Sequence, residues 1–462
     1  MESNTGFLKQ KGQSLVLSLI LMSFAAMTVL YSYNTAQLNI KSTKLQHTAD
    51  NAAYSIATIA VRDFNFKAYT NRASVANQVA VAQMVGLSSW FNMAERFSEN
   101  ACDVLCWVPY LGQVIGAIRS SVGYANQVVQ PFTEIMITAE NTILGILRFS
   151  QNAIHFASAS ASFITATKIV HANDEKAELS FAQNPQLIEN IHNVWFTFQK
   201  EHNRNLQNRS NTQFIDFKTV ILKSRDPFST TRRYKLNFPW TFTFWPMKRR
   251  WKTEKAGGSE LISNQNEAES WTSMDTLSFD LSKWSCGWSG CGWRGYKETP
   301  LGWGATRSDD RADITRLGSQ SLWGQSRAVN KTASKYAANN QQTSGVYSGV
   351  QPFYGLSNSA VKKNHTDNIV VVVSKEQKDA RTTSSVDLAG KNIDPATAEK
   401  MLGDRLNSIS ASQAYYSRPT DLWSRADGKH EYGNLYNPFW QARLTDTTNL
   451  ERTMALALTR LL

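Results

Sequence analysis

The sequence predicts an α+β protein in which an N-terminal transmembrane helix continues into a long helical stalk or hairpin, followed by a mixed, mainly antiparallel β domain. Three observations favour this class: an uncharged apolar run near the N-terminus, apolar and small residues at steps of three and four after it, and strict alternation of aromatic residues between 234 and 244. Steps of three and four are typical of a helix with one buried face, and alternation is typical of a half-buried strand. We expect four regions: residues 1–13, 14–33, 34–190 and 191–462.

The apolar segment 14–33 is about 20 residues long, which matches the thickness of a bilayer core. Its large apolar side chains include Leu15, Leu19, Phe24 and Leu30. Lys9 and Lys11 precede the segment, and the next basic residue is Lys41. The positive-inside rule therefore predicts a single-pass protein with residues 1–13 in the cytoplasm and everything after residue 33 outside it.

A cleaved secretory signal is the alternative to a retained anchor, because both begin with a basic stretch and an apolar centre. Asn34 and Ala36 make a poor small-x-small cleavage pair, which favours the anchor. Gly12 is a candidate prepilin-type processing site, but Leu17 stands where a pilin normally has Glu. Processing at Gly12 stays open.

We expect residues 34–190 to form the helical stalk. Apolar and small residues recur from Leu45 through Ile56 at helical spacing, and alanines are dense up to Ala82. Small residues allow close helix contacts, either within the protein's own hairpin or between molecules. We expect a second helix between residues 108 and 171, with Pro109 and Pro131 marking its boundaries. Its polar residues argue against a second membrane span.

The N-terminal segment resembles a known family. Lys11-Gly12-Gln13 precedes the apolar run, and a stretch with Leu45, Gln46, Ala49, Asp50, Ala52 and Ala53 follows it. This pattern is similar to that of TadG-like (TadE/TadG-type) proteins of the tight-adherence, or Flp, pilus-assembly system. The resemblance covers about residues 9 to 60. It implies a role in pilus assembly or anchoring in the cell envelope, with other pilus-assembly or pilin-like membrane proteins as partners.

We expect residues 191–462 to form a basic β-rich domain. The net charge of the chain is +12, and the excess lies beyond residue 190, because the earlier part has equal numbers of acidic and basic residues. Alternating aromatics from Tyr234 to Phe244 predict a strand, and Pro239 places it at a sheet edge or a bulge. A loop-rich insertion is expected near 304–351, where Ser, Asn, Gln and Gly dominate.

A basic cluster containing Arg249, Arg250 and Trp251 follows the aromatic strand. Basic residues mixed with aromatics suit a phosphate backbone or anionic lipid headgroups, and they also suit a solvated hairpin end that keeps a strand soluble. No recognition motif for nucleic acid accompanies the cluster, so we expect no nucleic-acid partner. The lipid bilayer is an expected partner through the anchor.

Four cysteines occur in two close pairs, Cys102/Cys106 and Cys286/Cys291. In an oxidising compartment this spacing favours two local disulfides, and bridging Cys102 to Cys106 requires that the helix be strained or ended there. A zinc site is the weaker alternative, because no histidine pair accompanies the cysteines. The second pair lies beside Trp288 and Trp293, which either present a contact surface or fill a thin core that the bridge staples.

Catalytic motifs are absent from the sequence: it has no phosphate-binding glycine loop, no Gly-x-Ser-x-Gly and no His-Glu-x-x-His. Asp280-Leu281-Ser282 begins like the metal site of von Willebrand A domains, but Trp284 replaces its second serine, so no such site is expected. We therefore expect no catalytic residues, no metal and no cofactor, and so not an enzyme.

The sequence thus favours a non-enzymatic protein of the bacterial inner membrane whose bulk is periplasmic or extracytoplasmic. The resemblance implies tight-adherence pilus assembly through protein contacts. The alternative is a module on a membrane anchor that binds an envelope surface or glycan. The sequence leaves open whether the chain also associates with copies of itself.

Overall fold

The structure is a computed structural model of the 462-residue chain. It describes residues 13–106, 110–179, 184–203, 212–237, 242–244, 247–262, 269–288, 290–310, 322–376 and 405–454. The chain divides into two compact units, each built from separated stretches. Unit 1 comprises Met1–Phe66, Ile154–Lys200 and Leu356–Leu462, and unit 2 comprises Lys67–Ala153 and Glu201–Gly355. Each unit therefore contains both helical and strand segments, which differs from the linear order of domains expected above.

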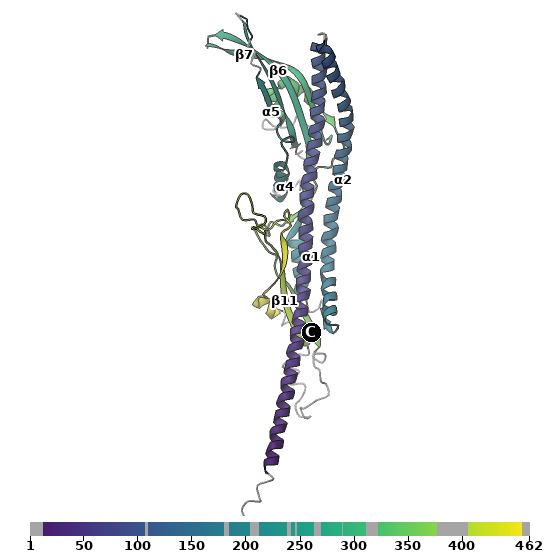
Figure 1. Cartoon of the computed structure of the whole chain (residues 1–462), viewed down its shortest axis with the longest axis vertical. Helices are drawn as coiled ribbons and strands as arrows, with labels where there is room; N and C mark the ends of the chain where they lie inside the picture. Colours follow the sequence, from purple (N-terminus) through teal and green to yellow (C-terminus); the bar gives the residue numbers. More distant parts are fainter. Residues whose placement is uncertain are drawn as a thin grey trace, which may run out of the picture. The chain divides into compact units, whose positions relative to one another are not determined.

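Two long helices, α1 (Gln13–Leu105) and α2 (Leu111–Asn173), contribute to both units (Figure 1). The first turns of α1 are apolar and exposed, including Leu15, Leu19 and Phe24. Within the part of the chain that the structure describes, α1 is the one helix long and apolar enough to cross a membrane, and its most apolar window buries no side chain. Gly12 and the lysines before it lie outside the described residues.

From Leu45 onward, α1 has a continuous buried face with side chains at steps of three and four, as predicted. The members of this face are unusually small or polar. Besides alanines, it buries Asp63, Lys67, Asn71, Gln78 and Ser89. A face of this composition packs closely only if its polar groups find partners inside the protein.

The two helices run antiparallel within each unit. In unit 2, Ser88 donates to Gln130 (2.6 Å) and Gln151 donates to Asn71 (2.8 Å). In unit 1, His155 faces Asp63 at 3.7 Å. The predicted helical hairpin is therefore present, and much of its register is set by amide and hydroxyl side chains.

The prediction that Pro131 marks a boundary of the second helix is wrong, because Pro131 lies inside α2. Proline removes one backbone hydrogen bond and usually kinks or ends a helix. Here the neighbouring turns are held by tertiary contacts: Gln130 bonds Ser88 of α1, and Thr133 bonds Ser344 (3.2 Å). Pro109 lies outside the described residues.

Unit 1 contains a four-stranded antiparallel sheet in the order β1-β10-β11-β12. Its strands are β1 (Ala177–Glu178), β10 (Ile369–Glu376), β11 (Arg405–Tyr416) and β12 (Trp440–Thr445). The valines of β10 are buried on both faces of the strand. The helix α3 (Pro185–His192) and a π-helical turn, η1 (Asn193–Thr197), follow β1. Asn184 ties α3 to the sheet by bonding both backbone groups of Val372.

The larger sheet of unit 2 has the order β3-β5-β6-β7-β8, with β4 also paired to β5. Its strands are β3 (Tyr234–Asn237), β4 (Phe242–Phe244), β5 (Met247–Ile262), β6 (Ser270–Gly287), β7 (Gly290–Arg307) and β8 (Gln342–Thr343). The predicted aromatic strand thus corresponds to β3 and β4, and Phe238–Thr241 lie outside the described residues. Both strands pair only with β5 among described strands, which is the edge position that Pro239 predicted.

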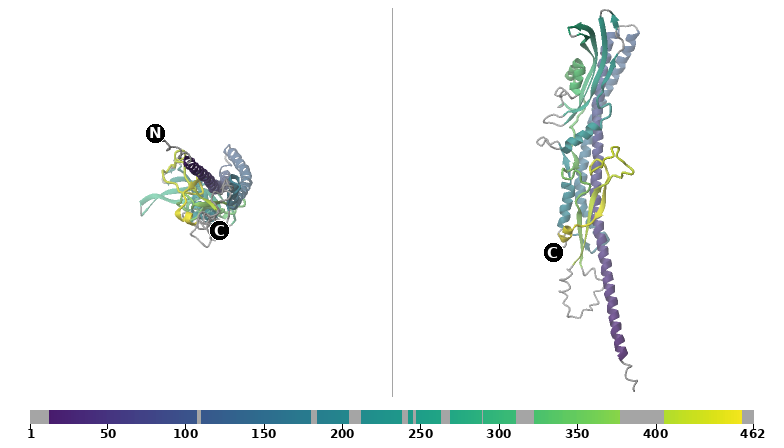
Figure 2. Two further views of the ribbon diagram at one scale, coloured as in Figure 1. Left: turned by 90° about the horizontal axis from the view of Figure 1, so that it is seen from below. Right: turned by 90° about the vertical axis from the view of Figure 1, so that its left-hand side faces the viewer.

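The other short elements are β2 (Gln199–His202), which pairs with β9 (Phe353–Leu356), and the helices α4 (Thr212–Lys223), α5 (Leu322–Val329) and α6 (Lys331–Asn339). Figure 2 shows these elements from two further directions.

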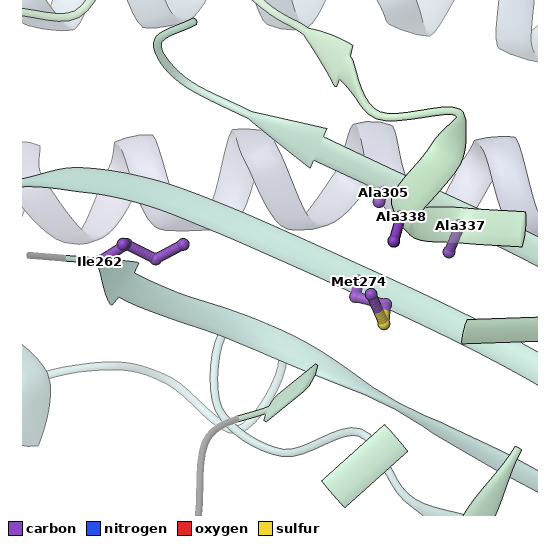
Figure 3. Close-up of a cluster of buried hydrophobic side chains, with 5 residues drawn as sticks. All are labelled: Ile262, Met274, Ala305, Ala337 and Ala338. Carbon is purple, nitrogen blue, oxygen red and sulfur yellow. The ribbon is translucent and has the colours of Figure 1, made fainter. Parts of the chain in front are cut away.

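One face of the unit 2 sheet lies directly on α1. A Cβ atom on Gly304 would fall 2.3 Å from the carbonyl oxygen of Ser89, and one on Gly302 would fall 2.5 Å from that of Met93. Glycine at both positions therefore lets β7 touch the helix backbone. The other face of the sheet is covered by α5 and α6, and Figure 3 shows the small core formed there. Its members are Ile262, Met274, Ala305, Ala337 and Ala338.

The expected loop-rich insertion at 304–351 is wrong for most of its described part, because α5, α6 and β8 lie there. The start of α6 is capped from β7: the carboxylate of Glu298 accepts from the backbone N–H groups of Thr332 (2.6 Å) and Ala333 (3.0 Å). An acidic group at that end satisfies free N–H groups and the helix dipole. Residues 311–321 lie outside the described part of the chain.

Candidate functional site

The far end of the β6–β7 hairpin brings together the cysteines and tryptophans that the sequence singled out. Cys286 pairs directly with Cys291 across the two strands and forms a disulfide with it. One step back, Trp284 pairs with Trp293, and their rings meet edge to face with centroids 5.4 Å apart. The strand β6 ends at Gly287 and β7 begins at Gly290, which adopts a φ of +98° that favours glycine. We call residues 283–294 the tryptophan hairpin.

The indoles of the tryptophan hairpin face solvent to different extents. Trp288 at the turn is fully exposed, Trp284 retains 38% of its surface, and Trp293 is half-buried. Tryptophan exposed without a core to fill is unusual and is enriched at contact surfaces. The disulfide does close the hairpin, but Trp288 does not fill a core beneath it.

The basic cluster lies on the neighbouring strand. Arg249 pairs with Lys283, and Trp251 pairs with Leu281. The structure describes the backbone at Arg249, Arg250 and Trp251, and the positions of their side chains lie outside what it describes. The sheet therefore brings the basic cluster beside the tryptophan hairpin, which sequence separation alone did not reveal.

The base of this sheet is fixed to α1 by a buried ionic cluster that the sequence did not indicate. Asp275 is fully buried and accepts from Arg232 (2.6 Å), Lys255 (2.7 Å) and Ser89 of α1 (3.0 Å). Two cations around one carboxylate satisfy its charge away from water. The cluster has no exposed member apart from the partly accessible Lys255, so we assign it to holding the sheet.

Glu254 is a second buried carboxylate in the same unit. Burial would raise its pKa, but hydrogen bonds and charges from Lys252 and Arg233 outweigh that effect and lower it. For Asp280 the effect of burial outweighs the attraction of Lys252, so the pKa of its carboxyl is raised. Asp280 pairs in register with Lys252 and Glu298 within the sheet and so does not form a metal-binding loop. The described residues include no group of three or more His, Cys, Asp or Glu side chains placed to hold a metal ion.

Unit 1 contains a buried polar group around Asp63, which accepts from Gln199 (2.7 Å) and faces His155. Asp63 is fully buried and His155 is 4% exposed. The imidazole of His155 also contacts the rings of Phe156 and Phe196 edge to face. A carboxylate and an imidazole enclosed in this way cannot meet a substrate without opening the core, so we assign them to helix register.

The family-motif residues are structural in this fold. Leu45, Ala49, Ala52 and Ala53 are completely buried. Gln46 bonds Asp50 (2.9 Å) and the carbonyl of Ile409 (3.0 Å), and Ser412 of β11 donates to the carbonyl of Ala53 (2.6 Å). The small residues here serve packing of α1 on β11, so this stretch of α1 is not an open face for another molecule.

A disulfide also joins Cys102 to Cys106 in unit 2. The helix α1 ends at Leu105, and the N–H of Cys106 still donates to the carbonyl of Cys102 (2.8 Å). The predicted pair of local disulfides, and the helix end that the first one required, are therefore confirmed.

A further surface appears on α2, where the sequence analysis saw only a helix packed on its neighbour. Large apolar side chains between 39% and 74% exposed recur along one side of it. Those in unit 2 are Val114, Ile118, Tyr124, Val128, Phe132, Ile135, Ile143, Ile146 and Phe149. We call this set the α2 stripe. Its spacing of three and four is present in the sequence, but the spacing does not tell which apolar face is covered.

No charged residue interrupts the α2 stripe. Arg119, Glu134, Glu140 and Arg148 all fall on other sides of the helical repeat. In unit 1, an apolar groove of about 770 Å³ lies between α2 and α3, lined by Phe163, Ile164 and Ile188 among others. Soluble proteins seldom expose contiguous apolar surface of this kind unless something binds it.

These features define a class of protein: an α+β chain with one apolar helix long enough to cross a membrane, two local disulfides and exposed aromatic and aliphatic surfaces. Comparisons of the chain with protein-family models, with curated proteins and with solved structures found no match.

Proposed function

We propose that this protein is held in the bacterial inner membrane by α1 and works through protein contacts in the assembly or anchoring of a tight-adherence-type pilus. The resemblance of residues 9–60 to TadG-like proteins suggests the process. The observation that supports a contact role is the α2 stripe, because it is long, apolar, uncharged and exposed.

The α2 stripe suits a helical or pilin-like partner. Side chains three and four apart on one helix offer ridges that fit the grooves of a second helix. Exposed aromatic residues such as Phe132 (48% exposed) and Phe149 (74% exposed) would supply most of the binding energy when buried. The absence of charge on this face means that association there depends on apolar burial and only weakly on salt.

The test is affinity capture of the tagged full-length protein from gently solubilised native membranes, followed by mass spectrometry. We expect the platform, the ATPase or minor pilin-like proteins of the pilus to accompany the wild-type chain. The variant Val128→Gln/Ile135→Gln/Ile146→Gln should lose them, because it places amides across the centre of the stripe.

The matched control is Gln127→Ala/Glu134→Gln, which changes exposed positions of the same helix away from the stripe. Control and wild type should recover the same partners. Repeated absence of pilus components from the wild-type capture would reject the pilus role. Equal recovery with the stripe variant would reject the stripe as its contact site.

The exposure of Trp288 favours a second candidate function, in which the tryptophan hairpin binds an envelope surface or glycan. Replacement of Trp288 by Ser should then weaken binding to isolated envelopes and leave the thermal unfolding of the protein unchanged. Unfolding of the variant would instead indicate that the indole has a structural role.

A further inference from the structure

The segment between β11 and β12 carries two exposed apolar side chains that the proposed function does not use. Leu422 is 78% exposed and Trp423 is 61% exposed. Both end a tight turn, in which the carbonyl of Pro419 accepts from the N–H groups of Leu422 (3.2 Å) and Trp423 (2.8 Å). We call residues 419–423 the Leu-Trp turn. It belongs to unit 1, within the yellow segment that projects in the right-hand view of Figure 2.

The backbone of the Leu-Trp turn is held from behind by a polar network. Arg418 donates to the carbonyl of Trp423 and also pairs with Glu431. Asn434 (2.9 Å) and Asn437 (2.6 Å) donate to the same carboxylate, which is 6% exposed. An exposed indole on a backbone fixed in this way loses little conformational freedom on binding. Aromatic residues of this kind contribute most of the binding energy in many protein interfaces.

The apolar groove between α2 and α3 lies in the same unit and offers a matching surface. Ile164 (54% exposed) comes from its α2 wall and Ile188 (47% exposed) from its α3 wall. Its volume of about 770 Å³ is within the range of sites that enclose a small ligand, so it has room for a leucine and an indole side chain. Its described lining residues include none from the Leu-Trp turn, so the turn of the same chain does not fill it.

The charges of the two surfaces are opposite. Asp421 is the one charged residue of the Leu-Trp turn, and it is exposed. The two arginines nearest to it in the sequence are each paired with a carboxylate. The groove has Lys168 and His171 on its α2 wall, and none of its described lining residues is acidic. A Leu-Trp turn seated in this groove would therefore bury apolar side chains and set a carboxylate beside a cation.

We propose that copies of this chain associate head to tail, with the Leu-Trp turn of one copy seated in the α2–α3 groove of the next. Asp421 then lies close to Lys168 of that next copy. The contact joins two different surfaces, so repeating it generates rings or open rows of copies. It involves neither the α2 stripe nor the tryptophan hairpin, and it can therefore fail or hold independently of the proposed function.

The heights of the two surfaces along α1 define how such copies would stand in a membrane. The Leu-Trp turn is near the level of Asn65, which bonds the backbone at the end of the same segment. The groove is nearer the anchor, because α2 runs from His155 beside Asp63 to Asp174 beside Lys44. The offset is about 11 residues of α1, or roughly 16 Å. Neighbouring copies would meet by tilting, as membrane helices do by about 20° on average and up to about 40°.

The test measures the mass of the full-length protein in a mild detergent by analytical ultracentrifugation over a wide range of concentration. The turn variant is Leu422→Ser/Trp423→Ser, and the groove variant is Ile164→Gln/Ile188→Gln. Each should raise the dissociation constant at least about 30-fold, since truncating a central aromatic anchor or its pocket costs about 2 kcal/mol or more. The two variants mixed should form a one-to-one complex, because one retains the groove and the other retains the turn.

A charge swap tests the polar part of the contact. Asp421→Lys should weaken association several-fold, most strongly at low salt, and Lys168→Asp in the same chain should restore it. The control Leu444→Ser removes an apolar residue of β12 that is 47% exposed and should associate like the wild type. The triple glutamine variant of the α2 stripe should also associate like the wild type, which separates this contact from the pilus role.

Three results would overturn the proposal. The first is a wild type that stays monomeric, and association gained on removing residues 455–462 would then assign the groove to that segment of the same chain. The second is unchanged association of either the turn variant or the groove variant, which would exclude that surface. The third is a mixture of the two variants that stays monomeric, although each unfolds at the wild-type temperature by circular dichroism.

Discussion

At the scale of single residues, each unit encloses a carboxylate that is held by at least one cation and by neutral hydrogen-bond donors. Asp275 has two cations and a hydroxyl, and Glu431 of unit 1 has Arg418, Tyr416, Asn434 and Asn437 around it. Glu431 is 6% exposed, and it holds together the segment between β11 and β12. Charged groups placed in this way stabilise a fold only while they keep their charge.

Glu431 predicts a dependence of stability on pH. Burial would raise its pKa, but the hydrogen bonds from Tyr416 and Arg418 and from the two asparagines lower it from 4.5 to about 2. A lowered pKa means that the unfolded segment binds protons more readily than the folded one. The stabilisation is therefore complete above pH 4.5 and is lost as pH falls towards 2, by about 3 kcal/mol in total.

Hydrogen exchange of the amides between residues 417 and 439 measures this effect. We expect protection to fall between pH 4.5 and pH 2 in the wild type, whereas Glu431→Gln should already exchange faster at pH 7. Glu189→Gln, at an exposed position of α3, is the control and should match the wild type. Protection that does not change down to pH 2 would contradict the role of Glu431.

At the scale of elements, the contact between α1 and β7 depends on backbone lying against backbone. Gly302 and Gly304 allow β7 to reach the turns of α1 that contain Ser89 and Met93. The polar side chains of the same face of α1 then bond into the sheet: Ser88 meets Thr306 at 2.9 Å, and Ser89 meets Asp275. Small side chains and hydroxyls here act together, because the bonds can form only at this short separation.

Gly304→Ala should therefore separate β7 from α1. The added methyl would lie 2.3 Å from the Ser89 carbonyl, and we expect a loss of about 1–3 kcal/mol in local stability. Faster hydrogen exchange of the β7 amides reports this loss directly. The control is Gly116→Ala on α2, where nothing lies within 4 Å of the new methyl and helix propensity should improve by about 1 kcal/mol. Equal protection of β7 in Gly304→Ala and wild type would show that the contact is not tight.

Several elements could be predicted from local sequence patterns, and others could not. The continuation of α1, the edge position of β3 and β4, and the two short disulfides follow from periodicity, one proline and cysteine spacing. The helix α6 could not be predicted in this way, because its Ser, Asn and Ala composition is also typical of a loop. Its stability comes from the Glu298 cap and from buried Asn330, which donates to the carbonyls of Glu254 (2.9 Å) and Thr276 (3.3 Å).

The candidate site could also be predicted only in part, because local sequence patterns show only residues that are close in the sequence. The Cys and Trp residues were visible in the sequence, since they lie within ten residues of one another. The position of the basic cluster beside them was not, because it depends on the register of β5 against β6, which pairs Arg249 with Lys283. The α2 stripe was missed because amphipathic spacing identifies faces of a helix without telling which of them the rest of the chain covers.

At the scale of the whole molecule, the membrane topology is the prediction that most of the proposed function requires. Alkaline phosphatase fused after residue 60 should be active, because the fusion point would lie outside the cytoplasm. A green fluorescent protein at the same point should be dark for the same reason. Replacing Lys9 and Lys11 by Glu should lower the phosphatase activity, since those residues set the orientation. An inactive phosphatase together with a fluorescent fusion would overturn the topology.

The buried face of α1 in unit 1 has a consequence for biosynthesis. The alanines of that face are covered by β11, and the bond from Ser412 to Ala53 joins residues 359 positions apart. Ribosomes add about 5–20 residues per second, so this face waits roughly 20–70 s for its covering strand. During that interval the new chain exposes the small apolar residues of this helix face. We expect a holding chaperone to bind the exposed face, and chains truncated before residue 405 to be removed by proteases.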